Sequence, residues 1–119
     1  MIDSLEWVKS AVIGKDLIDG FVVKNFLGGG GSGAVFRAEK GIEYNAIKIV
    51  DLELYYGNND PDRALTAIVN EILLQQRVYD KCPAHVVRIF AYKAMSINGR
   101  RVMLIRMELL VRNHFRLYG

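Results

Sequence analysis

Apolar residues follow a strand-like pattern along five segments of the chain and a helical period along two others. Alternating or β-branched and aromatic runs predict strands, whereas apolar residues three and four positions apart predict a helix. The predicted strands are 21–27, 34–39, 42–50 (or 44–50), 86–95 and 101–107. The predicted helices are a short one, in which Leu5, Val8, Ala11 and Val12 share a face, and a long one over Asp60–Tyr79. This order predicts an α+β fold with a five-stranded antiparallel sheet, one long helix and a short N-terminal helix.

Short local signals set the boundaries of these elements. Asp60-Pro61 predicts the start of the long helix, because aspartate caps a helix and proline fits its first position. Cys82-Pro83 is expected to end that helix. Asn98-Gly99 predicts a tight hairpin turn between the last two strands. The polar segment 51–59 is expected to be a connecting loop.

A run of glycines separates the first two predicted strands and reads Gly28-x-Gly30-x-x-Gly33-x-Val35. Glycine lets the backbone come close to a ligand, and successive backbone N–H groups can then point at phosphate oxygens. Ala46-Ile47-Lys48 lies on the returning third strand, which places Lys48 beside the glycines. The pattern therefore predicts a phosphate-binding hairpin.

Strand, glycine loop, strand, turn and strand with lysine resemble the start of a eukaryotic-type (serine/threonine) protein kinase domain. Asn70-Glu71-Ile72 resembles the family's helix-C glutamate, and 85–89 and 104–110 resemble its fourth and fifth strands. The resemblance implies the N-terminal small lobe only, over residues 18–110. It implies a helical extension at 1–17 and, at 111–119, a hinge run-on toward a missing large lobe.

The resemblance also implies roles for individual residues. Lys48 would pair the phosphates of ATP and would be held by Glu71. Val35 and Ala46 would sandwich the adenine ring, Met107 would be the gatekeeper, and the hinge would follow it. The implied catalytic residues are Lys48 and Glu71. The implied ATP-binding residues are Leu27, Gly28, Gly29, Gly30, Gly31, Ser32, Gly33, Val35, Ala46, Lys48, Met107, Glu108 and Leu109.

Three positions depart from the family pattern or add nothing to the site. Gln75 stands one turn after Glu71, where the family usually has an apolar residue touching the fourth strand. Ser32 stands where an aromatic residue is usual at the loop tip. His85 is expected to be a structural residue rather than a ligand.

The family's His-Arg-Asp and Asp-Phe-Gly motifs, which supply the catalytic base and a magnesium ligand, do not occur in the 119 residues. We therefore expect this chain to bind ATP without transferring phosphate alone, with magnesium held only together with the large lobe. In the full-length enzyme the resemblance implies phosphate transfer to protein serine or threonine. The expected partners are ATP and a protein substrate or the kinase large lobe.

The same residues suggest two other functions. One is a stand-alone, small-lobe-like module that binds another protein through the face that normally meets the large lobe. The other is a dinucleotide-binding domain, which requires a helix to begin at the third glycine. The few residues between Gly33 and Tyr44 leave no room for that helix.

Composition limits the expected partners and the expected cellular location. A formal net charge of +3 is too small to indicate nucleic-acid binding. The single cysteine, Cys82, excludes an intramolecular disulfide and fits a reducing cytoplasm. No apolar run approaches the roughly 20 residues of a membrane span, and Asp3 and Glu6 argue against a signal peptide. The expected location is the cytoplasm, with no membrane partner and no metal site.

Overall fold

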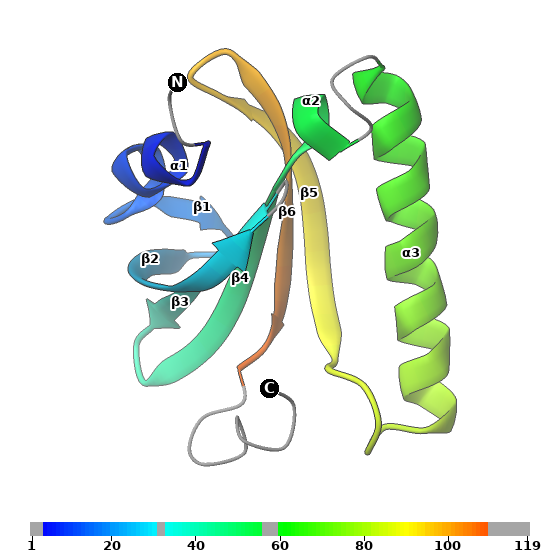
Figure 1. Cartoon of the computed structure of the whole chain (residues 1–119). Helices are drawn as coiled ribbons and strands as arrows, with labels where there is room; N and C mark the ends of the chain where they lie inside the picture. Colours follow the sequence, from blue (N-terminus) through cyan, green and yellow to red (C-terminus); the bar gives the residue numbers. More distant parts are fainter. Residues whose placement is uncertain (1–3, 31–32, 56–59, 110–119) are drawn as a thin grey trace.

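A computed structural model describes residues 4–30, 33–55 and 60–109. Its sheet has six antiparallel strands in the order β1-β2-β3-β4-β6-β5 (Figure 1). The strands are β1 Asp16–Ile18, β2 Phe21–Gly30, β3 Gly33–Lys40, β4 Glu43–Asp51, β5 Ile89–Ile97 and β6 Arg100–Glu108. The helices are α1 Ser4–Val12, α2 Leu52–Tyr55 and α3 Pro61–Lys81.

The prediction of a five-stranded sheet is wrong, because β1 adds a sixth strand at the edge. This strand has only three residues, which is too short for any alternation to be read. It forms because the chain reverses at Asp19-Gly20, where both residues have positive φ values of 55° and 83°. That reversal lays β1 antiparallel on the first residues of β2.

The sheet curls until its two edge strands approach each other (Figure 1). Lys93 Nζ on β5 donates a hydrogen bond to the Leu17 carbonyl oxygen on β1 at 3.3 Å. Register shifts in β2, after Val23 and again after Phe26, mark the irregularities that increase strand twist and bending. The sheet is therefore nearly closed and strongly curved, a feature that the predicted strand order did not include.

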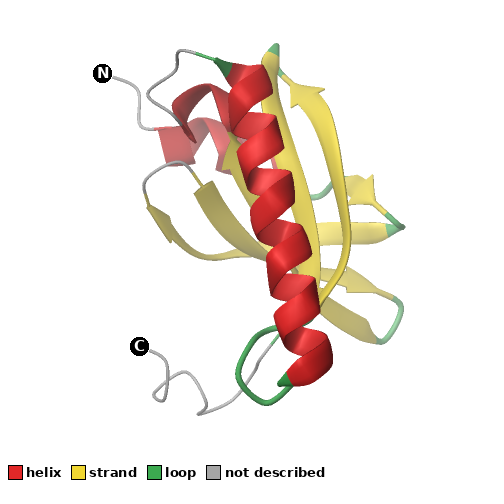
Figure 2. Cartoon of the chain, turned by 90° about the vertical axis from the view of Figure 1, so that its right-hand side faces the viewer, coloured by secondary structure: helices red, strands yellow, loops and turns green. Residues whose placement is uncertain are grey.

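Alternation along the strands gives the sheet two apolar faces. The inner face includes Phe36, Ile47 and Leu104 and packs against the short N-terminal helix α1. Helix α1 packs on this face through Val8, which is buried, and through Trp7, which is partly buried. The outer face carries a second apolar cluster and is covered by α3 (Figure 2).

The long helix α3 was predicted within two residues at each end, because its boundaries are encoded locally. Asp60 Oδ1 accepts hydrogen bonds from the Asp62 and Arg63 backbone N–H groups, both at 3.1 Å. Ala64, Ile68 and Ile72 recur at helical spacing and are buried against the outer face. Of the apolar residues that set the helical period in the sequence, Ile68 and Ile72 are buried and Leu65 is partly buried, but Leu73 is 42% exposed.

Two predicted boundaries are wrong. Segment 51–59 was expected to be loop throughout, but Leu52–Tyr55 forms the single-turn helix α2, and 56–59 lie outside the described residues. Asp51 nucleates this turn, because its Oδ1 accepts from the Glu53 N–H at 3.0 Å. β5 was expected from Val86 but begins at Ile89. The turn at Asn98-Gly99 is confirmed, with φ values of 51° and 81°.

Replacing Asp60 with alanine should lower the free energy of unfolding by about 1 kcal/mol, because two backbone donors of α3 lose their acceptor. Urea unfolding followed by circular dichroism would measure the change. Asp60→Asn is the matched control, since asparagine caps helices as well as aspartate does. Equal losses in both variants would show that the capping oxygen is not what matters.

Candidate functional site

Strand register brings four of the predicted site residues together on the outer face. Val35 on β3 is the pairing partner of Lys48 on β4, and Lys48 is in turn the partner of Ile105 on β6. Ala46, two residues before Lys48 and so on the same face, is paired with Met107. The same pairing directs Ile47 and Ile49 into the inner core. Val35, Ala46, Lys48 and Met107 therefore share the face covered by α3.

A pocket of about 510 Å³ lies over Val35, Ala46 and Met107 of this group, but Lys48 does not line it. It is lined by Leu27, Val35, Ala46, Met107, Glu108 and Leu109 on the sheet side and by Pro83, Ala84, His85, Val86 and Val87 on the other. The six sheet-side residues were all predicted to contact one ligand. The lining is mainly apolar, which suits a flat ring rather than a charged group.

A second, smaller cavity of about 70 Å³ contains both predicted catalytic residues. Lys48 reaches it from β4, and Glu71 reaches it from the middle of α3. Met107 lines both this cavity and the larger pocket, so the two are neighbours. The predicted proximity of Lys48 and Glu71 is therefore found in the fold.

The glycine segment is more strand-like than predicted. Gly28, Gly29 and Gly30 belong to β2 and pair with Val35, Ala34 and Gly33. The strands therefore extend past the predicted ends of 27 and 34, because backbone pairing continues where no side chain interferes. Gly31 and Ser32, which were also predicted to bind the ligand, lie outside the described residues.

Gly33 brings the backbone of the hairpin close to Lys48. A Cβ added at Gly33 would lie 3.2 Å from the Ile49 carbonyl oxygen and 3.6 Å from Lys48 Cε. The first of these contacts is tighter than an ordinary van der Waals approach, and carbonyl oxygens of a paired strand cannot move freely. Glycine is therefore the residue that fits here, and the Lys48 side chain passes beside the position that a Cβ would take.

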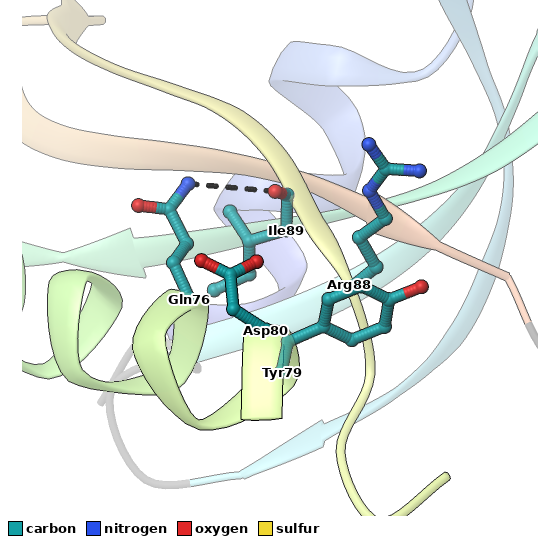
Figure 3. A pocket seen from close by; sticks show the side chains of 5 residues that line it. All are labelled: Gln76, Tyr79, Asp80, Arg88 and Ile89. Carbon is teal, nitrogen blue, oxygen red and sulfur yellow. Dashed lines mark hydrogen bonds between the residues drawn. The ribbon is translucent and has the colours of Figure 1, made fainter. Parts of the chain in front are cut away.

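Two successive glutamines of α3 bind the segment that leads into β5. Gln75 Nε2 donates to the Val87 carbonyl oxygen at 2.8 Å, and Gln76 Nε2 donates to the Ile89 carbonyl oxygen at 3.4 Å. Figure 3 shows the second of these bonds at the edge of a polar pocket of about 260 Å³. Tyr79 and Arg88 also line that pocket. Gln75 therefore contacts the segment before β5 through a hydrogen bond, whereas the family pattern has an apolar contact at this position.

Residues 83–87 are the part of the site that sequence reasoning missed. They were assigned to the end of a helix and the start of a strand, and His85 was expected to be structural. Instead they form an irregular segment, tied by the His85 N–H to the Cys82 carbonyl oxygen at 3.0 Å, and they line the larger pocket. Pro83 was the available signal, because a proline after a helix predicts irregular backbone.

A reciprocal pair of hydrogen bonds joins Glu108 to Arg88. The Glu108 N–H donates to the Arg88 carbonyl oxygen at 2.8 Å, and the Arg88 N–H donates to Glu108 Oε1 at 3.2 Å. These bonds fix the end of β6 against the segment before β5. Glu108 and Leu109, predicted to lie along the ligand, therefore form one wall of the larger pocket.

Within 4–30, 33–55 and 60–109, no three His, Cys, Asp or Glu side chains are grouped as metal ligands. None of the described helices has the length and apolar character needed to cross a membrane. No protein-family model matches the chain, and no curated protein matches it.

Proposed function

We propose that this chain binds ATP on the outer face of its sheet. The observation that carries the proposal is that Leu27, Val35, Ala46, Met107, Glu108 and Leu109 line one pocket. That pocket adjoins the cavity of Lys48 and Glu71. A base-sized apolar pocket beside a lysine and a glycine hairpin suits a ligand with a flat ring at one end and phosphates at the other.

Each part of the ligand would have its own partner. The adenine ring would lie in the larger pocket against Val35 and Ala46. The phosphates would lie toward Lys48, close to the backbone amide of Gly33. Glu71 would hold the lysine from the helix side. Magnesium would be held only by residues of a second lobe.

The resemblance to serine/threonine protein kinases extends the proposal to the biological role. We propose that ATP bound here serves phosphate transfer to a protein, with the catalytic base and metal ligands supplied by a large lobe. The chain alone is proposed to be inactive in transfer. Its single cysteine, which is exposed, supports a reducing location such as the cytoplasm.

A second candidate function is binding of another protein through exposed apolar residues of α3. Leu74 and Val78 lie one turn apart on α3 and are 57% and 37% exposed. Exposed apolar side chains grouped on one face indicate an interaction surface. This function does not require ATP, so an ATP titration separates the two proposed functions.

Adding ATP should shift the amide signals of Gly28, Gly29, Gly30 and Gly33 in two-dimensional NMR spectra. We expect a dissociation constant near ~1 mM, because an open, wet site lacks the contacts of a second lobe. Lys48→Met should weaken binding by roughly two- to fivefold, since a solvent-screened charge contributes little more than a surface ion pair. Added salt should weaken it as well.

Lys15→Met is the matched control, because it removes the same charge at an exposed position just before β1. This variant should bind ATP as the parent chain does. If the glycine amides stay still while another surface responds, the proposed site is wrong. Unchanged spectra at ATP concentrations well above 1 mM would favour the protein-binding function instead.

A further inference from the structure

Strand β5 forms one edge of the sheet and, among the described strands, pairs only with β6 (Figure 1). Ile97 and Arg100 close the two-residue turn between these strands, so they form a hydrogen-bonded pair. Hydrogen-bonded and non-hydrogen-bonded pairs alternate along an antiparallel ladder, and the register is regular from Ile97 back to Ala91. Every second residue of this stretch therefore directs its backbone N–H and C=O groups away from β6. These residues are Tyr92, Ala94 and Ser96.

The outward-facing backbone groups of these three residues have no hydrogen-bond partner in the ranges that the structure describes. All three residues are exposed to solvent. A row of unpaired N–H and C=O groups on an edge strand is a template for another strand. Extended peptides bind proteins in this way, with main-chain hydrogen bonds supplying affinity and alternate side chains supplying specificity. The β5 edge, defined as Tyr92–Ser96, therefore has the backbone chemistry of a strand-addition site.

The opposite edge strand, β1, does not pair with the β5 edge. Between the described residues of β1 and β5, the hydrogen bond found is the one from Lys93 Nζ to the Leu17 carbonyl oxygen, at 3.3 Å. A lysine side chain thus spans the space between these two strands, whereas neighbouring strands of a sheet lie about 4.8 Å apart and bond through their backbones. An added strand would therefore displace one side-chain hydrogen bond and no backbone pairing.

Lys93 carries the charge that an added strand would meet. Its side chain is exposed, and no carboxylate of the described residues lies within ion-pair distance of it. Lys93 alternates with Ala91 and Met95, which pack against the inner core, so it projects toward the inner side of the sheet. A strand with a carboxylate opposite Lys93 would gain a cross-strand ion pair.

A second copy of β5 is disfavoured at this edge by the same lysine. If that copy were added antiparallel about Ala94, the two copies of Lys93 would be diagonal neighbours on the inner side. Like charges this close oppose pairing, and inward-pointing charges are one means by which edge strands avoid self-association. On the outer side, the edge presents the ring of Tyr92, which is 38% exposed and pairs well with apolar or β-branched residues.

We propose that the β5 edge binds an extended acidic segment of another protein, which adds a seventh strand to the sheet. The segment carries a carboxylate opposite Lys93 and apolar, β-branched or aromatic residues on either side of that carboxylate. Lys93 supplies the specificity, because it opposes a second copy of the chain and favours an acidic partner. The proposal involves neither the candidate ATP pocket nor Lys48.

The probe is the amidated peptide Ser-Thr-Val-Glu-Val-Thr-Ser with a fluorescein label at its N-terminus, titrated with the full chain and followed by fluorescence anisotropy. We expect saturable binding. The same peptide with lysine in place of glutamate should bind about three- to tenfold more weakly, because an ion pair becomes a like-charge contact. Lys93→Glu should reverse this preference between the two peptides. The matched change Lys24→Glu, at an exposed position of β2, should leave the preference as it is.

Backbone pairing is tested separately from charge. With valine side chains on the outer side, the valine N–H groups of the peptide face β5 and the glutamate N–H faces away. N-methylation of both valines should therefore weaken binding by about tenfold or more, whereas N-methylation of the glutamate should leave it nearly unchanged. Ala94→Pro removes an outward N–H from the protein side, at a position where an edge strand tolerates proline, and should weaken binding similarly.

Binding that is lost on N-methylation of the valines and reversed in charge preference by Lys93→Glu supports the proposal. Equal effects of N-methylation at the valines and at the glutamate overturn it, as does the absence of saturable binding. A preference that Lys93→Glu does not change overturns the role of the lysine. If sedimentation shows that the chain itself dimerises and that Ala94→Pro abolishes the dimer, the edge is occupied by a second copy and the proposal is wrong. If Ala94→Pro does not fold, the methylated peptides decide, because they leave the protein unaltered.

Discussion

Replacing Phe36 with alanine is expected to lower the free energy of unfolding by about 3–5 kcal/mol. Phe36 lies in the middle of β3 and is completely buried in the inner core. Its ring packs edge-to-face against Phe26, with the centroids 5.6 Å apart. The alanine variant would lose this contact and leave a cavity that the curved sheet cannot fill, because the sheet is fixed by pairing on both sides of β3.

A loss of this size is a large part of the total stability of a domain, which is about 5–15 kcal/mol. Thermal and urea unfolding of the purified variant would measure it. Ile42→Ala is the control, since Ile42 is 92% exposed at the tip of the next hairpin and should change stability by less than about 0.5 kcal/mol. Similar losses in both variants would contradict the assignment of the inner core.

Replacing Asp51 with alanine is expected to lower the free energy of unfolding by about 2–3 kcal/mol. Asp51 is the only buried charged side chain in the described residues, with an exposed fraction of 2%. Its Oδ2 accepts from Arg100 Nε at 2.9 Å and lies 2.8 Å from Arg100 Nη2, while its Oδ1 caps α2. Removing one member of a buried ion pair leaves its partner poorly compensated. Arg100 is partly exposed and can recruit water, so the loss is smaller than for a fully buried pair.

The next arginine supplies a matched control for this prediction. Arg101 pairs with Asp62 at 2.8 Å, the same distance as in the Arg100–Asp51 pair, but the Asp62 side chain is 83% exposed. Asp62→Ala should therefore cost less than about 1 kcal/mol in the same urea-unfolding measurement. If the two aspartates proved equally important, burial would not be what gives the Asp51 pair its strength.

Elements whose signals are local could be predicted from the sequence. The carboxylate of Asp60 caps the first turn of α3, and a proline follows it in the sequence, so the start of that helix is encoded in adjacent residues. The turn at Asn98-Gly99 is likewise set by two residues that adopt positive φ. Neither depends on where the rest of the chain lies.

Elements that exist only through distant partners were missed. The three residues of β1 have no period of their own and become a strand by pairing with β2. Asp19-Gly20 was an available signal for that hairpin, because Asp-Gly favours this kind of turn. The single turn of α2 needs the capping bond from Asp51, whose carboxylate is held in place by Arg100 from β6.

The candidate site divides in the same way. Val35, Ala46 and Lys48 were expected at one site through the resemblance, which aligns them on neighbouring strands of one hairpin. The observed register puts them on one face of that hairpin. The opposite wall at 83–87 could not be predicted, since its path depends on a hydrogen bond from Gln75 and on the Glu108–Arg88 pair, contacts between segments far apart in sequence.

The pairing of β4 with β6 has a consequence for how the chain folds. The hairpins β2–β3, β3–β4 and β5–β6 join consecutive strands, but β4 and β6 meet across the whole of α2, α3 and β5. Closing so long a loop is slow compared with forming a hairpin, so the pairing of β4 with β6 should be the last part of the sheet to form. Until it closes, both strands present open edges on which another copy of the chain could pair and aggregate. Lys48 on β4 and Arg106 on β6 place a positive charge on each of these edges and disfavour such pairing. The lysine of the candidate site is therefore expected to limit aggregation during folding, before any ligand binds.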